Sequence, residues 1–146
     1  MMLLWIPLLI CGQTPVEINF SNREALALEI TVKDLYIGLV NPATGPIEIP
    51  GAIEGKIYAN TNWVLISSTQ EDFISLEGNT IPINRLKWRV GGKDYSPFKM
   101  GDVHLLEGNP TSEDGMYFSV DLMLDLKWKD EAGEYSTKLM FTVMKQ

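Results

Sequence analysis

The chain has 146 residues, enough for one domain with a substantial core. Hydrophobic residues make up 45% and charged residues 21% of the chain, a balance that excludes wholesale disorder. The formal net charge is −7, and the few Lys and Arg residues are scattered along the sequence. Nucleic acid and anionic membrane surfaces both attract clustered basic side chains, so the charge argues against either as a partner.

Residues 1–12 predict a secretory signal peptide that is removed before Gln13. They form an uncharged apolar run of about ten residues, whereas a membrane span takes about twenty. The positively charged start that such signals carry is missing. Cys11, the single cysteine, leaves an alternative open, because Leu8-Leu9-Ile10-Cys11 resembles a bacterial lipobox and would make the chain a membrane-anchored lipoprotein. Either way the mature chain is expected to be exported, with no disulfide and no transmembrane span.

The remaining residues, 13–146, predict a single all-β domain. Short stretches of alternating apolar and polar residues are separated by Gly, Pro, Asn and Asp, the residues that turns require. This pattern predicts an antiparallel β-sandwich, immunoglobulin-like or pilin-like, with about eight or nine strands. The expected strands are residues 16–20, 26–32, 35–40, 52–59, 62–68, 86–90, 103–106, 117–129 and 133–144.

The alternation is clearest near the C-terminus, in residues 117–129 and 133–144. Successive side chains on a strand point to opposite faces, so the apolar set is expected in the core. That set comprises Phe118, Val120, Leu122, Leu124, Leu126 and Trp128, followed by Leu139, Phe141 and Val143. The intervening Asp121, Asp125, Lys127 and Lys138 are expected to be exposed.

The C-terminal segment also carries a resemblance to known proteins. Ala132-Gly133-Glu134-Tyr135 and the closing Phe141-Thr142-Val143 resemble the terminal strand of secreted bacterial pilin-like and spore-coat-like surface proteins, and residues 35–42 and 60–65 are similar to other segments of them. Residues 130–135 also resemble the motif in which immunoglobulin-like domains form a tyrosine corner. The resemblance implies a β-sandwich in a cell-surface compartment, with no catalytic residues.

The inventory of reactive side chains predicts that the protein is not an enzyme and binds no cofactor. His104 is the only histidine, which excludes a histidine-based triad or a multi-histidine zinc site within one chain. It alternates with apolar neighbours and is expected to be exposed on a strand. No nucleotide-binding or hydrolase motif occurs. Loop acids at residues 113–114 and 130–131 leave a calcium site as an open alternative.

Two candidate contact sites remain. Met140 and Met144 lie on the polar side of the last predicted strand, where a free surface rarely places methionine, and they suggest contact with another copy or a related subunit. Trp63 opens a strand beside Asn60 and Asn62 and could stack on a polysaccharide. Trp88 and Trp128 are expected in the core instead.

The first expectation is therefore a secreted structural or adhesive subunit of a bacterial cell-surface layer or fibre. The alternatives are a carbohydrate-binding module and the lipoprotein. The position of Trp63 separates the first two, because a buried ring favours assembly and an exposed ring favours a sugar site.

Overall fold

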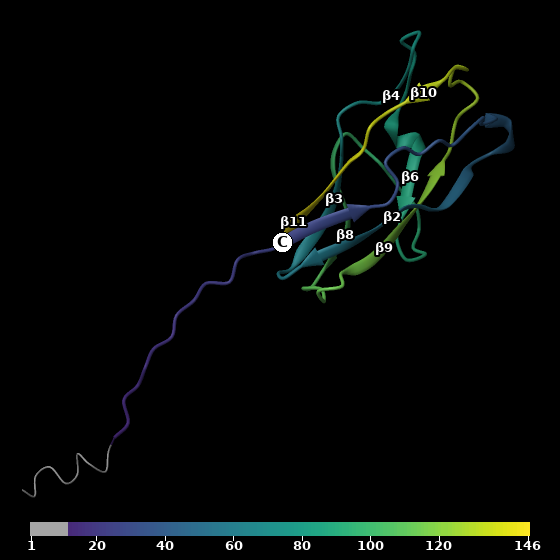
Figure 1. The fold of residues 1–146 in the computed structure, drawn as a ribbon. Helices are drawn as coiled ribbons and strands as arrows, with labels where there is room; N and C mark the ends of the chain where they lie inside the picture. Colours follow the sequence, from purple (N-terminus) through teal and green to yellow (C-terminus); the bar gives the residue numbers. More distant parts are fainter. Residues whose placement is uncertain (1–11) are drawn as a thin grey trace, which may run out of the picture.

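The computed structural model describes residues 12–146, so Cys11 and all of the expected signal peptide except Gly12 lie outside the described residues. The described part is all-β, with 11 strands in antiparallel sheets that pack as a β-sandwich (Figure 1). This confirms the predicted fold class, with more strands than expected. No helix between residues 12 and 146 is long and apolar enough to span a membrane.

The larger sheet has five strands. In spatial order they are β1 (Leu26–Ile30), β2 (Ile47–Ala59), β9 (Met116–Leu124), β6 (Leu86–Arg89) and β7 (Ser96–Pro97). In β9 every second side chain, from Phe118 to Leu124, is buried, as its alternation predicts. The long β2 bends at a bulge between Ile49 and Ile53, where Gly51 has a φ of 60° that other residues rarely adopt.

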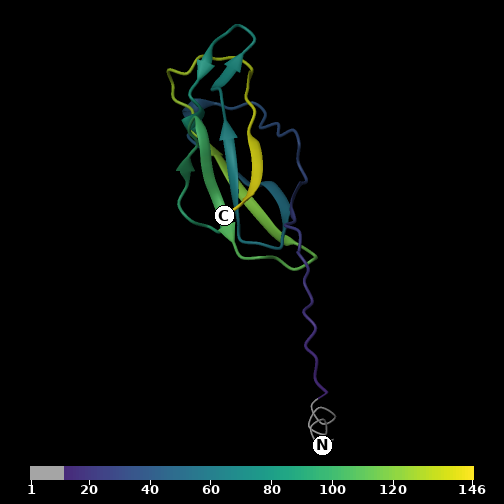
Figure 2. The same ribbon diagram turned by 90° about the vertical axis from the view of Figure 1, so that its left-hand side faces the viewer.

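The opposing sheet has three strands: β11 (Met140–Lys145), β3 (Trp63–Thr69) and β8 (Gly101–Gly108), with β3 in the centre. A small third sheet of β10 (Tyr135–Ser136), β4 (Phe73–Ser75) and β5 (Thr80–Ile81) lies at the end of the sandwich away from the N-terminal segment (Figure 2). Two short 3-10 turns, η2 (Pro42–Thr44) and η3 (Ile83–Arg85), complete the described elements.

The side chains of the core between the sheets are buried to different degrees on the two sides of the sandwich. Side chains from β2, β3, β8 and β9 are buried, among them the predicted Leu122 and Leu124. The inward side chains of β1 and β11 are only half-buried against the same core, as are Ile37 and Val40 from the loop after β1. The half-buried apolar residues of the two edge strands are Leu26, Leu28, Ile30, Phe141 and Val143. β1 and β11 lie against each other, and the partial burial of their inward side chains makes this side of the sandwich the less covered one.

Two predicted strands are wrong. Residues 35–40 form no strand, because the segment runs as a loop that packs only Ile37 and Val40 on the core. Residues 16–20 form no strand because the described chain provides no neighbour for them to pair with. Their apolar side chains, Val16, Ile18 and Phe20, are 78%, 82% and 87% exposed.

The strand predicted for residues 117–129 ends early, at Leu124. The Asp130 carboxylate accepts a hydrogen bond from the Lys127 N–H (2.7 Å), and the Asp130 N–H donates to the Lys127 carbonyl (3.0 Å), which closes a turn. Trp128 lies within that turn and is 81% exposed, so its predicted core position is wrong. Leu126 remains half-buried against the core.

Asp121 and Asp125 were expected to be exposed, but both are half-buried. Asp121 pairs with Arg89 at 3.0 Å, and Asp125 pairs with Lys87 at 3.7 Å and Lys127 at 3.4 Å. The basic partners on β6 cover the carboxylates from the neighbouring strand. Lys127 and Lys138 are exposed as predicted.

Candidate functional site

The outer side of β11 carries the two methionines expected to contact a partner. Met140 and Met144 are 64% and 47% exposed. They lie opposite Ser68 and Val64 of β3, and Thr142 between them lies opposite Ile66. Val64 and Ile66 alternate with core residues, so they belong to this outer side. We call Met140 and Met144, with the buried Val64 and Ile66 beside them, the methionine face; its accessible part is the two methionines.

One edge of β11 is open. The strand pairs with β3 alone, and no ladder joins it to β1 beside it. Its end is held in place: the Gln146 N–H donates to the Asn62 carbonyl (3.0 Å), and the Lys145 ammonium lies 3.6 Å from the Glu24 carboxylate. A long edge strand with free backbone groups is a template for pairing with another chain. The predicted contact residues thus lie on an edge strand whose end is held in place.

The residues proposed for sugar stacking do not form a binding surface. Trp63 is fully buried, and its indole N–H donates to the Asn109 carbonyl at 2.8 Å. The Asn60 amide accepts a hydrogen bond from the Ala25 N–H and donates to the Arg23 carbonyl, both at 2.8 Å. The Trp63 ring is therefore a core residue, and the Asn60 amide fastens the chain entering β1. Asn62 is exposed, but the buried Trp63 ring offers no aromatic surface next to it.

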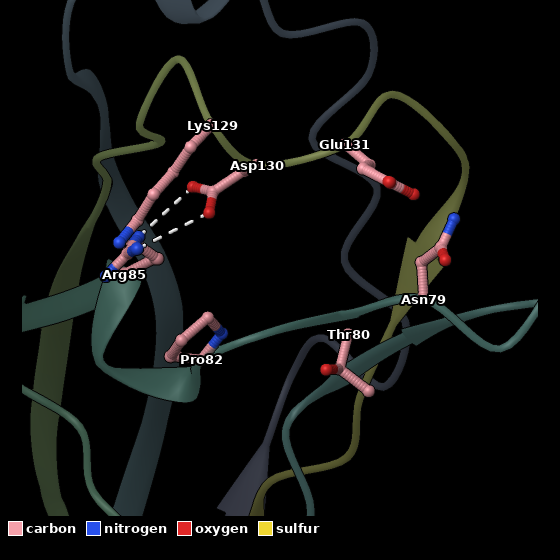
Figure 3. A pocket seen from close by; sticks show the side chains of 7 residues that line it. All are labelled: Asn79, Thr80, Pro82, Arg85, Lys129, Asp130 and Glu131. Carbon is pink, nitrogen blue, oxygen red and sulfur yellow. Dashed lines mark hydrogen bonds and ion pairs between the residues drawn. The ribbon is translucent and has the colours of Figure 1, made fainter.

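A polar depression of about 270 Å³ opens near the third sheet (Figure 3). Arg85 and Asp130 point toward each other across one side of it, with Nε–Oδ2 and Nη2–Oδ1 distances of 3.1 and 3.4 Å. The charge of Arg85 is thereby balanced within the protein. Asp130 is occupied by Arg85 and the Lys127 N–H, and residues 12–146 contain no cluster of three or more His, Cys, Asp or Glu side chains suited to a metal ion. The depression offers no concentrated charge for a ligand.

Tyr135 forms the hydrogen bond that the sequence motif suggests. Its hydroxyl donates to the Glu131 carbonyl, four residues upstream, at 2.8 Å. This is the bond of a tyrosine corner, which fixes the chain where it enters the last strands of a sandwich. His104 is exposed on β8, as predicted, opposite Ile66.

Two carboxylates are held ionised by their surroundings. Asp121 accepts a hydrogen bond from the Gly51 N–H (2.7 Å) at the β2 bulge and another from Arg89, and these lower its pKa in that order of importance. For Asp130, burial opposes ionisation, but the hydrogen bonds from Arg85 and the Lys127 N–H together outweigh it, and the pKa is lowered. Both groups therefore stabilise the fold in their charged form.

We expect the protein to lose stability in acid. A carboxylate whose pKa is lower in the folded than in the unfolded state contributes stability that is complete above the unfolded value, about 3.9, and lost as the pH falls through the folded value. The Asp121→Asn variant removes one such group. The difference in urea midpoint between wild type and Asp121→Asn should be largest above about pH 5 and shrink below about pH 4. A difference that stays constant with pH would mean that ionisation of Asp121 does not stabilise the fold.

No family model and no curated protein matches this chain.

Proposed function

We propose that this protein is a non-enzymatic structural or adhesive subunit that is secreted and assembles, with itself or related subunits, into a bacterial cell-surface layer or fibre. The observation that carries the proposal is the methionine face on an edge strand with one open side. The two exposed methionines give apolar contact area, whereas Val64 and Ile66 between them are buried, and methionine adapts to the shape of a partner. The open edge adds backbone groups that a partner can bind.

Further support comes from the C-terminal segment. The alternation of β11 is what the pilin-like and spore-coat-like resemblance of residues 132–143 implies, and the Tyr135 bond is the one that the immunoglobulin-like motif implies. Secretion rests on the composition of residues 1–12. The carbohydrate-binding alternative loses its stacking surface because the Trp63 ring is enclosed in the core.

A substitution that adds a charge to the methionine face tests the proposed self-association. Replacing Met140 with Glu should leave the fold intact, because the side chain is mostly in water. It should weaken self-association by at least about tenfold, since the added carboxylate must be desolvated in the contact. Sedimentation velocity over a concentration series measures the change.

The matched control is Met100→Glu. Met100 is 47% exposed and lies outside the methionine face, just before β8, and the substitution changes the net charge equally. It should leave association within about twofold of wild type, as surface changes usually do. A wild type that is monomeric at its highest soluble concentration would contradict the proposal, as would equal effects of the two variants.

A further inference from the structure

The structure exchanges the positions that the sequence predicted for two tryptophans. Trp63, the expected surface ring, is fully buried, whereas Trp128, an expected core residue, is 81% exposed. Tryptophan is a large, mostly apolar side chain that is highly buried on average, so this exposure is unusual. The turn that carries Trp128 is held firmly, because the Lys127 N–H donates to the Asp130 carboxylate and the Asp130 N–H donates to the Lys127 carbonyl. An aromatic ring held in water on a fixed turn is available to a ligand.

Polar depressions are lined by both ends of this turn. The depression of about 270 Å³ described above is lined by Lys129 and Asp130, which directly follow Trp128 in the chain. A second depression, of about 260 Å³, is lined by Lys127, which directly precedes Trp128. Arg85 lines both, so the two depressions are neighbours. The turn with the exposed ring therefore separates two adjacent polar depressions.

The side chains around the first depression suit a ligand rich in hydroxyl groups. Figure 3 shows residues 129–131 and Asn79 on different sides of it. Among the lining side chains, only Arg85 and Asp130 are joined by hydrogen bonds. The Asn79 amide and the Glu131 carboxylate are not bonded to the other lining side chains, and they provide donors and acceptors to a ligand.

Most of the charges around the two depressions are paired within the protein. Arg85 pairs with Asp130, and the Asp125 carboxylate of the second depression lies 3.7 Å from the Lys87 ammonium and 3.4 Å from that of Lys127. Neither depression therefore concentrates charge of one sign for an ionic ligand. The net charge of −7 on the whole chain also disfavours a polyanion.

We propose that Trp128 and the two depressions beside its turn bind a neutral polysaccharide, with one sugar ring stacked on the indole and the flanking sugars in the depressions. A pyranose ring has an apolar face of C–H groups and a rim of hydroxyl groups, so it matches an aromatic face flanked by amide and carboxylate groups. A polymer fits better than a single sugar, because polar depressions adjoin the turn at both ends. This inference rests on the adhesive part of the proposed function and names its ligand class.

The first test removes the stacking ring in the full chain. Trp128→Ala is compared with Tyr117→Ala, since Tyr117 is 58% exposed and lies at the start of β9, whereas the Trp128 turn follows the end of that strand. Both rings lie mostly in water, so both variants should fold, as circular dichroism can verify. Affinity electrophoresis in gels that contain xyloglucan, galactomannan or mixed-linkage β-glucan measures binding to neutral polysaccharides.

At least one of these polysaccharides should retard the wild type. The affinity for it should fall at least about tenfold in Trp128→Ala and less than about twofold in Tyr117→Ala. A wild type that none of them retards would overturn the inference, as would equal retardation of the wild type and Trp128→Ala.

The second test removes a polar group of the first depression. Asn79→Ala should weaken binding by about threefold to tenfold, the effect of losing a hydrogen bond. The backbone N–H and carbonyl of Asn79 keep their bonds to Ser75 in this variant, so the hairpin should persist. Asn62→Ala, which truncates an exposed asparagine that lines neither depression, is the control and should bind as the wild type does. Equal affinities of the two variants would place the ligand outside the depression and overturn the site.

The third test concerns the charge of the ligand. Binding of a neutral polysaccharide should change by less than about twofold between about 0.05 M and about 0.5 M sodium chloride, because salt screens only ionic contacts. Polygalacturonate, a polyanion, should bind more weakly than the neutral polysaccharide. Tighter, salt-sensitive binding of polygalacturonate would overturn the neutral ligand and indicate an anionic one held by the lysines of the turn.

The binding and association measurements separate this inference from the proposed self-assembly. Met140 lines neither depression, so the Met140→Glu chain should bind polysaccharide as the wild type does. Self-association without polysaccharide binding would remove the sugar site and leave the assembly. Polysaccharide binding by a chain that stays monomeric would support the sugar site and remove the assembly.

Discussion

Replacing Trp63 with alanine should lower the free energy of unfolding by about 3–5 kcal/mol, the usual range for emptying the site of a buried large aromatic side chain. The Trp63 ring is fully buried and packs over Gly108, its partner across the β3–β8 ladder, where a Cβ would lie only 2.6 Å from the ring. The variant also leaves the Asn109 carbonyl without the indole N–H that it accepts from at 2.8 Å. Urea unfolding followed by far-UV circular dichroism measures the loss.

Trp128→Ala is the matched control. Its ring is 81% exposed in a turn, so its removal should change stability by less than about 0.5 kcal/mol. If the two variants unfolded at the same urea concentration, Trp63 would not be the core residue that the structure shows. The comparison also tests the reason for setting the sugar site aside, because a stacking residue on the surface could be removed at little cost in stability.

Trp63 shows where alternation stops being informative. The pattern predicts a buried face only when the other face is wet, as in β9 and β11. β3 is the central strand of its sheet, and every residue from Trp63 to Ser67 is buried. The neighbours on both sides cover the outward Val64 and Ile66 as well, so a strand-opening tryptophan could not be placed from the local sequence.

The exposure predicted for Asp121 on β9 was wrong for a related reason. The alternation places Asp121 on the polar side, which is correct, but its burial comes from Arg89 and from the Gly51 N–H, 32 and 70 residues away in the chain. Such pairings depend on the register between strands. The end of β9 depends on Asp130, whose side chain closes the turn around Trp128, and apolar spacing alone does not reveal that bond.

Residues 16–20 illustrate the opposite case. Their alternation is as clear as that of β1, yet only β1 has a strand beside it, since residues 26–30 pair with β2. A sequence pattern specifies which face of a strand is apolar but not which chain supplies the neighbour. The exposed position of Met140 and Met144 could be predicted from the sequence because β11 is an edge strand with a regular pattern.

Replacing Gly55 with alanine should lower the free energy of unfolding by about 3 kcal/mol, toward the upper end of the range for overpacking a core. Gly55 lies between β1 and β9, opposite Ile30 and Phe118. An added Cβ would clash with the backbone carbonyl oxygen of Glu29 and would lie 2.9–3.0 Å from the Phe118 ring. The ring can turn aside, but the carbonyl moves only if β1 separates from β2.

The expected result is therefore a local loosening of β1 together with the loss of stability. In Gly55→Ala, amide hydrogen exchange should speed up over Leu26–Ile30 more than in β3, because β1 pairs with β2 alone. Lys56→Ala is the control, an exposed neighbour on the same strand whose truncation should cost less than about 0.5 kcal/mol. Urea unfolding and hydrogen exchange measured on the same samples give both quantities. Equal stability of the two variants would show that the contact between β1 and β2 relaxes freely, and β1 would then not be held firmly against β2.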